Sequence, residues 1–68
     1  MKAIRIARVR AGLSQAELGR LVDRDQSDIS RIETGRNDLP VSLLKRIAAA
    51  LGVPPADLLE EVDERAAA

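Results

Sequence analysis

The side chains best equipped for specific chemistry in this chain lie in the stretch QSDISRIETG, residues 26–35. If this stretch is a short helix, four polar side chains share its outward face: Gln26, Ser27, Ser30 and Arg31. Glutamine can bond adenine through two hydrogen bonds at once, and serine can bond either kind of base edge. Arginine can bond guanine through two hydrogen bonds, or it can bond a phosphate. These four residues are therefore candidates for reading bases.

Asp28 lies among these side chains, soon after Asp23 and Asp25, and acidic groups repel DNA phosphates. Two readings of Asp28 remain open. It could accept a hydrogen bond from N4 of cytosine and so select sequence, or it could flank the contact and only repel phosphates. We favour the flanking role, and both readings predict weak binding to generic DNA.

The composition excludes several classes of function. The 68 residues form one domain, and they include no cysteine, histidine or aromatic residue. Disulfides, thiolate or histidine metal sites and histidine catalysts are therefore absent, and no phosphate loop accompanies the serines and aspartates. No aromatic platform for single-stranded nucleic acid exists. We expect no enzyme activity, no catalytic residue, no metal and no cofactor.

The zero net charge hides an asymmetry between the two halves of the chain. Residues 1–36 carry eight basic and five acidic residues, giving +3, whereas residues 37–68 carry three basic and six acidic residues, giving −3. The first half is suited to a polyanion. No membrane span or signal peptide is recognisable, so we expect a cytoplasmic protein with no membrane partner and no small-molecule substrate.

Helical periodicity and strong helix formers predict helices throughout and no strand. The first runs from about residue 2 to residue 11, where Gly12 stops it, with these inward positions: Ile4, Ala7, Val9 and Ala11. The second begins near Gln15, after the capping-box pair Ser14 and Glu17, with these inward positions: Leu18, Leu21 and Val22. Asp25 can cap the third helix, which buries Ile29 and Ile32 and ends at Gly35.

Two further helices complete the expected domain. Pro40 suits the first turn of the fourth, which Gly52 ends and which buries Leu43, Leu44, Ile47, Ala48 and Leu51. Pro54 and Pro55 open the fifth, with Leu58, Leu59 and Val62 on one side. We expect one domain over residues 1–62 and a frayed tail over residues 63–68.

The second and third helices meet at a tight connection between residues 22 and 26, and the third shows a polar face. That is the layout of a helix-turn-helix, in which the second helix enters the major groove of DNA. The stretch GLSQAELGRLVDRDQSDISRIETGR, followed by LLKRIAAALGVPPADLL, resembles the Cro-type (phage-repressor-like, XRE) helix-turn-helix family over about residues 4–60. The resemblance implies a compact, all-α, five-helix lambda-repressor-like domain that binds double-stranded DNA sequence-specifically.

The resemblance also implies roles for single residues. Gln15 matches a glutamine that bonds a backbone phosphate, and the four polar residues of the third helix match the positions that contact bases. Arg36 and Asn37 match a loop that touches phosphates. Arg8 and Glu33 match a partly buried ion pair that fixes the third helix against the first, which would withhold Arg8 from DNA.

The sequence departs from the family at the turn. Asp23 replaces the usual glycine, which aspartate can tolerate with some strain. Arg24 replaces an apolar residue, and either places a cation near the DNA backbone or lays its stem across the edge of the core.

Because one recognition helix covers few base pairs, we expect a homodimer on a palindromic operator. Val62 is the candidate interface residue. The leading interpretation is a transcriptional regulator, a repressor, controlled by concentration, dimerisation or a regulatory protein partner. The alternatives are an antitoxin or restriction-control protein of the same fold, or a protein-interaction module that has lost DNA binding.

Overall fold

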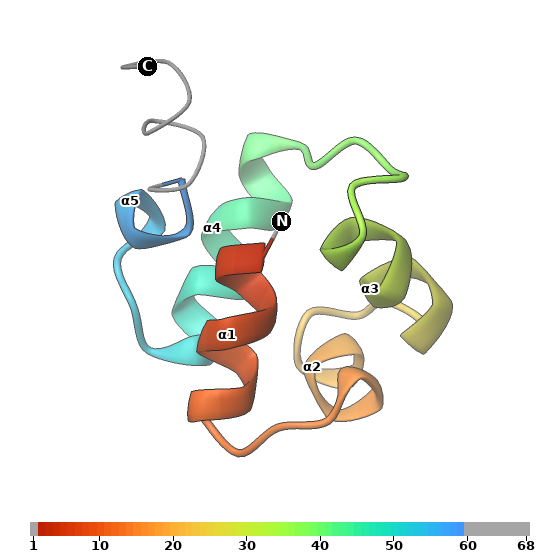
Figure 1. The fold of residues 1–68 in the computed structure, drawn as a ribbon, viewed down its shortest axis with the longest axis horizontal. Coiled ribbons are helices and arrows are strands. Elements are labelled where there is room, and N and C mark those ends of the chain that lie inside the picture. Colours follow the sequence, from red (N-terminus) through yellow and green to blue (C-terminus); the bar gives the residue numbers. More distant parts are fainter. Residues whose placement is uncertain (1, 60–68) are drawn as a thin grey trace.

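Five α-helices follow one another over residues 2–59: α1 (Lys2–Arg10), α2 (Gln15–Leu21), α3 (Gln26–Glu33), α4 (Val41–Leu51) and α5 (Pro55–Leu58). The structure is a computed structural model that describes residues 2–59, and within that range there is no strand. In Figure 1, α1 runs in front of α4, with α5 on one side and the α2–α3 pair on the other, and it contacts both α3 and α5. The predicted all-α, five-helix fold is confirmed. Val62 and the predicted tail lie outside the described residues.

The core contains most of the predicted inward positions. These side chains are buried: Ile4, Leu18, Val22, Ile29, Ile32, Leu43, Leu44, Ile47, Ala48, Leu51 and Leu58. Every inward position expected of α3 and α4 is among them. Burial of one face of each helix is what holds these short helices in place, because isolated helices of this length are marginal in water.

Four predicted inward positions are wrong or only partly right. Val9 and Leu21 are 61% and 59% exposed, Ala11 is exposed, and Leu59 is 37% exposed. Val9 follows Ile4 by five residues, which puts it on a different side of a helix with 3.6 residues per turn. The inward stripe of α1 instead passes from Ile4 through residues 7 and 8.

The ends of the helices follow the predicted signals, with one difference. Ser14 Oγ accepts from the Glu17 backbone N–H at 3.0 Å, and the Ser14 backbone N–H donates to Glu17 Oε1 at 2.9 Å, which is the expected capping box. Gly52 ends α4 with a φ of 72°. Asp25 occupies the N-cap position of α3, as predicted, but its side chain accepts no hydrogen bond from a backbone N–H of the described residues.

The connection between α2 and α3 depends on two residues. Asp23 adopts a φ of 60°, the left-handed conformation that glycine usually supplies at this position. Gly19 is buried in α2, its carbonyl oxygen accepts from the Arg24 backbone N–H at 2.7 Å, and a Cβ at Gly19 would overlap the Arg24 carbonyl oxygen. The tight turn is therefore possible because residue 19 has no side chain, a role that the sequence interpretation did not assign.

Candidate nucleic-acid interface

One side of α3 is fixed in the protein and the other faces solvent. Ile29 and Ile32 are 0% and 3% exposed, and Glu33 is buried beside them. On the opposite side the predicted base-contacting residues Gln26, Ser27 and Arg31 are exposed, and Ser30 is half-buried. One side of the helix thus packs against the core while a row of hydrogen-bonding side chains faces outward.

The residues predicted to contact phosphates surround α3. Arg24 lies in the turn immediately before α3, and Arg36 and Asn37 lie in the loop after it, and all three are exposed. The Arg36 backbone N–H donates to the Arg31 carbonyl at 2.8 Å, which fixes the start of that loop against the end of α3. The hydroxyl of Thr34 donates to the Ser30 carbonyl at 3.0 Å. The two ends of α3 therefore carry exposed cations at defined positions.

Asp28 makes a contact that neither sequence reading included. Its Oδ1 lies 3.7 Å from Nη1 of Arg31, and the two side chains are 33% and 55% exposed. A pair this exposed contributes little to stability. It nevertheless partly neutralises the cation that was predicted to bind guanine or phosphate, and so couples Asp28 to the reading face through Arg31.

The flank of α2 beside the turn mixes both signs of charge. A shallow depression there is lined by Gly19, Arg20, Asp23, Arg24, Asp25 and Asp28. Arg20, which the sequence interpretation did not single out, lies in it beside Arg24. No cluster of three or more possible metal-ligating side chains occurs in the part of the chain that the structure describes. With three acids beside two arginines, this flank has little net attraction for a polyanion.

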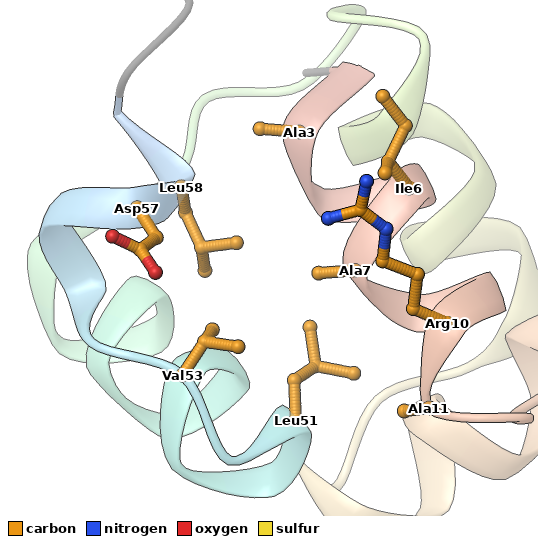
Figure 2. Close-up of a pocket in the computed structure, with 9 residues that line it drawn as sticks. All are labelled: Ala3, Ile6, Ala7, Arg10, Ala11, Leu51, Val53, Asp57 and Leu58. Carbon is orange, nitrogen blue, oxygen red and sulfur yellow. The ribbon is translucent and has the colours of Figure 1, made fainter.

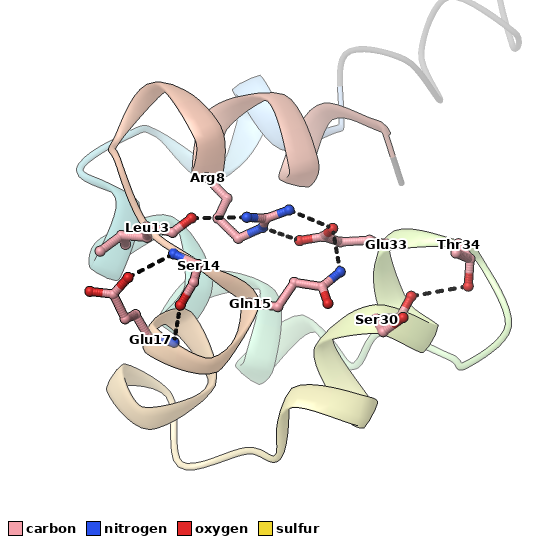
Figure 3. Close-up of polar contacts among 8 residues, drawn as sticks. All are labelled: Arg8, Leu13, Ser14, Gln15, Glu17, Ser30, Glu33 and Thr34. Carbon is pink, nitrogen blue, oxygen red and sulfur yellow. Dashed lines mark hydrogen bonds and ion pairs between the residues drawn. The ribbon is translucent and has the colours of Figure 1, made fainter.

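Arg8 and Glu33 form the ion pair that the resemblance implied (Figure 3). Arg8 Nε donates to Glu33 Oε2 at 2.6 Å and Arg8 Nη2 donates to Glu33 Oε1 at 3.2 Å, with the side chains 11% and 3% exposed. Arg8 Nη1 also donates to the Leu13 carbonyl at 2.9 Å. The guanidinium thus joins α1 to the end of α3 and to the loop before α2.

Gln15, predicted to contact a phosphate, is half-buried and belongs to the same network. Its Nε2 donates to Glu33 Oε1 at 3.1 Å (Figure 3). The sequence interpretation placed Gln15 and Glu33 in separate roles and missed this bond. Eighteen residues separate the two in the chain, and no local pattern signals a contact at that distance.

A second hollow, of about 650 Å³, lies between α1 and α5. Figure 2 shows its lining from Ala3, Ile6, Ala7, Arg10, Ala11, Leu51, Val53, Asp57 and Leu58. None of these is a predicted DNA contact. One cation and one acid on otherwise apolar walls do not make a catalytic constellation. Among the described residues, no helix has the length and apolar character needed to cross a membrane.

The geometry of α2, the turn and an outward-facing α3 defines a helix-turn-helix protein. A family model described as a helix-turn-helix domain matches residues 3–62, and the chain belongs to this family. It is 39% identical over 62 residues to the Neisseria hypothetical transcription factor from Neisseria meningitidis, a match over 91% of this chain and 58% of that relative's length. The resemblance to the Cro-type helix-turn-helix family is thereby confirmed.

Solved structures agree with the assignment. The restriction-modification controller protein C.AhdI from Aeromonas hydrophila is similar, with a TM-score of 0.80 and 30% identity over 84% of this chain and 83% of that one. The clp gene regulator ClgR from Corynebacterium glutamicum is also similar, with a TM-score of 0.87 and 30% identity over 97% of this chain and 70% of that one. The chain is therefore a helix-turn-helix domain, and these relatives are described as a transcription factor, a controller protein and a gene regulator.

Proposed function

We propose that the chain binds double-stranded DNA sequence-specifically as a transcriptional regulator, with α3 in the major groove. The observation that most supports this proposal is that α3 has a buried side and an exposed side. Ile29, Ile32 and Glu33 are buried, while Gln26, Ser27 and Arg31 are exposed. A helix fixed in this way presents its side chains to base edges without first having to be ordered. The descriptions of the relatives as a transcription factor, a gene regulator and a controller protein support the same function.

In this proposal, Gln26, Ser27, Ser30 and Arg31 contact bases, and Gln15, Arg24, Arg36 and Asn37 contact phosphates. The assignment rests on where each residue lies relative to α3, since base contacts specify sequence and phosphate contacts set register. The mixed charge beside the turn supports a protein whose affinity for generic DNA is low. Such a protein would discriminate between DNA sites mainly through α3. Its location would be the cytoplasm, because its DNA lies there.

We further propose that the chain acts as a repressor and binds a palindromic operator as a homodimer. A single α3 of eight residues spans few base pairs, and two copies on half-sites about one helical turn apart would read enough sequence for specificity. Val62 remains the proposed interface residue. Repression would follow from occupancy of the operator, and its level from chain concentration or from a regulatory protein partner.

A restriction-control function is the second candidate. Its support is the similarity to C.AhdI, which extends over 83% of that controller protein. Both candidates require the same DNA-binding surface, so the operator's position decides between them. A site upstream of a restriction–modification gene pair would favour restriction control.

Selection from a random duplex library tests the proposal. The full chain is incubated with the library at low salt, bound duplexes are recovered over several rounds, and the enriched sequences are measured by mobility shift across a salt series. We expect enrichment of a palindrome and an affinity that falls as salt rises. Absence of enrichment at low salt would refute DNA binding and would favour the protein-interaction module instead.

A further inference from the structure

The carboxylate of Glu33 is a shared acceptor for side chains of two other helices. Its Oε2 accepts from Arg8 Nε, while its Oε1 accepts from both Arg8 Nη2 at 3.2 Å and Gln15 Nε2 at 3.1 Å. Arg8 and Glu33 are largely removed from solvent, with 11% and 3% of their side chains exposed. A fixed ion pair therefore lies directly beside the first residue of α2.

The Glu33 carboxylate determines whether the nitrogen or the oxygen of the Gln15 carboxamide points toward it. A carboxylate only accepts hydrogen bonds, whereas a carboxamide has a donor nitrogen on one side and an acceptor oxygen on the other. Nε2 must face Glu33, and only one of its two N–H groups is used there. The second N–H of Gln15 is left to donate to another acceptor.

We infer that Glu33, held by Arg8, is a positioning residue for the phosphate contact of Gln15. The inference rests on the proposed function, because it requires a DNA phosphate near Gln15. A phosphate oxygen accepts hydrogen bonds. If the Gln15 carboxamide were flipped, so that its nitrogen and oxygen exchanged places, its oxygen would face the phosphate and repel it. Glu33 prevents that rotation, and Arg8 neutralises the carboxylate that would otherwise repel DNA.

The orientation of the Gln15 carboxamide can be tested without DNA. Gln15, Gln26 and Asn37 are the three side-chain amides of the sequence, so the NH₂ signals of the ¹⁵N-labelled full chain are few. Gln26 is a matched control because it is exposed on α3. We expect one Gln15 NH₂ proton to exchange with solvent more slowly than either Gln26 proton. Equal exchange at Gln15 and Gln26 would overturn the inference.

A binding cycle tests the consequence for DNA. The effect of Gln15→Ala on DNA affinity is measured in the parent protein and in the double variant Arg8→Met/Glu33→Leu. The double variant replaces the ion pair by apolar side chains, an exchange that proteins with a buried pair often tolerate. The probe is the duplex enriched by selection. In the parent, we expect Gln15→Ala to weaken binding about tenfold, as expected for a hydrogen bond to a charged group. In the apolar background the same substitution should change affinity by less than about twofold, the scatter of independent sites.

Gln26→Ala is the control of the cycle, because its base contact does not pass through Glu33. It should cost the same in both backgrounds, which a general loosening of α3 would not produce. An equal cost of Gln15→Ala in both backgrounds would overturn the positioning role. Wild-type affinity of Gln15→Ala would overturn it too, together with the phosphate contact proposed for Gln15, while leaving sequence-specific binding through α3 intact.

The remaining outcomes are also distinguishable. If Arg8→Met/Glu33→Leu does not fold, slow exchange of one Gln15 proton in the parent chain still supports the inference, and fast exchange still overturns it. If selection enriches no duplex, the proposed function fails by itself. In that case the phosphate role of Gln15 is overturned with it, whatever the amide exchange shows.

Discussion

At the scale of single residues, the exposed face of α3 combines selective and non-selective groups. Gln26 and Ser27 lie at its start and are exposed, whereas Arg31 lies beside Asp28, whose negative charge partly neutralises it. An arginine that is paired with a carboxylate attracts phosphates less strongly, whatever the DNA sequence, than an unpaired arginine does. The composition of this face therefore favours discrimination between sequences over tight binding to all of them.

Gln26→Ala should relax preference at one or two base pairs and cost about 1–3 kcal/mol on the best site. The reason is the loss of a side chain that can bond adenine through two atoms. Affinities for the enriched duplex and for single-base variants of it provide the measurement. Arg36→Ala is the matched control, which should weaken all sequences alike and lower the salt slope by about one. A uniform loss with Gln26→Ala would show that the residue does not read bases.

Asp28→Ala should strengthen binding to random-sequence duplex at low salt. The substitution removes a negative charge near the phosphates and releases Arg31, whose Nη1 lies 3.7 Å from the carboxylate. The gain should shrink as salt rises, because these groups are exposed and screened. A titration against a random and the enriched duplex measures both effects. Loss of specific binding alone would mean that Asp28 reads a base, contrary to the role we favour.

At the scale of the helices, the turn between α2 and α3 sets where the reading face lies. The turn closes because Arg24 donates its backbone N–H to the carbonyl of Gly19, in a place where a Cβ at residue 19 does not fit. The short connection thus fixes the position of α3 relative to α2. Changes at residue 19 should therefore affect both stability and DNA binding.

Gly19→Ala should destabilise the protein by about 1–3 kcal/mol, the usual cost of overpacking a filled site. The sign is diagnostic, because glycine to alanine inside an ordinary helix stabilises by up to about 1 kcal/mol. Urea unfolding followed by circular dichroism measures the change in free energy of unfolding. An increase in stability would contradict the steric role that we assign to Gly19.

The capping box at the start of α2 predicts a pH dependence. The pKa of Glu17 is lowered from 4.5, mainly by the backbone hydrogen bond from Ser14, with smaller contributions from the Ser14 side chain and the charge of Arg20. A lowered carboxyl pKa stabilises the fold above 4.5, and the contribution disappears as pH falls through the folded-state value.

Glu17→Gln should therefore flatten the acid limb of the stability curve. The free energy of unfolding is measured by urea at a series of pH values from neutral to below 4.5 for both proteins. The parent should lose more stability than the variant as the pH falls through this range. Parallel curves would mean that the Glu17 carboxylate does not contribute through its charge.

At the scale of the whole molecule, the ion pair of Arg8 and Glu33 joins helices that are distant in sequence. A 68-residue chain without disulfides has a small margin of stability, of the order of 3–5 kcal/mol. Stranding one buried charge costs about as much. The network thus links folding of the domain to placement of α3.

Glu33→Leu alone should lower the free energy of unfolding by about 3–5 kcal/mol and leave much of the chain unfolded, because Arg8 then stays buried without its partner. Arg8→Met/Glu33→Leu should recover most of that loss. Arg31→Met, which removes the exposed pair with Asp28, serves as the control and should cost less than about 1 kcal/mol. Helical circular dichroism under urea measures all three, and a double variant no more stable than Glu33→Leu would contradict the argument.

The sequence by itself determined the helices, their order and the polar face of α3. Helix signals and apolar spacing act over a few residues, so Ser14, Gly52 and the buried stripes of α3 and α4 could be predicted from their neighbours. Local reasoning also misplaced Leu21, because spacing alone does not say whether Leu21 or Val22 meets another helix. Val9 was misplaced although its spacing from Ile4 already puts it on a different side of α1.

Only the tertiary structure decided the contacts between distant segments. Glu33 meets Gln15 because α2 and α3 pack across a turn, and it meets Arg8 because α1 packs against α3. Such contacts depend on the packing angle of whole helices, which no local pattern encodes. The sequence thus predicted which residues could bind DNA, whereas packing decided that Gln15 donates to Glu33.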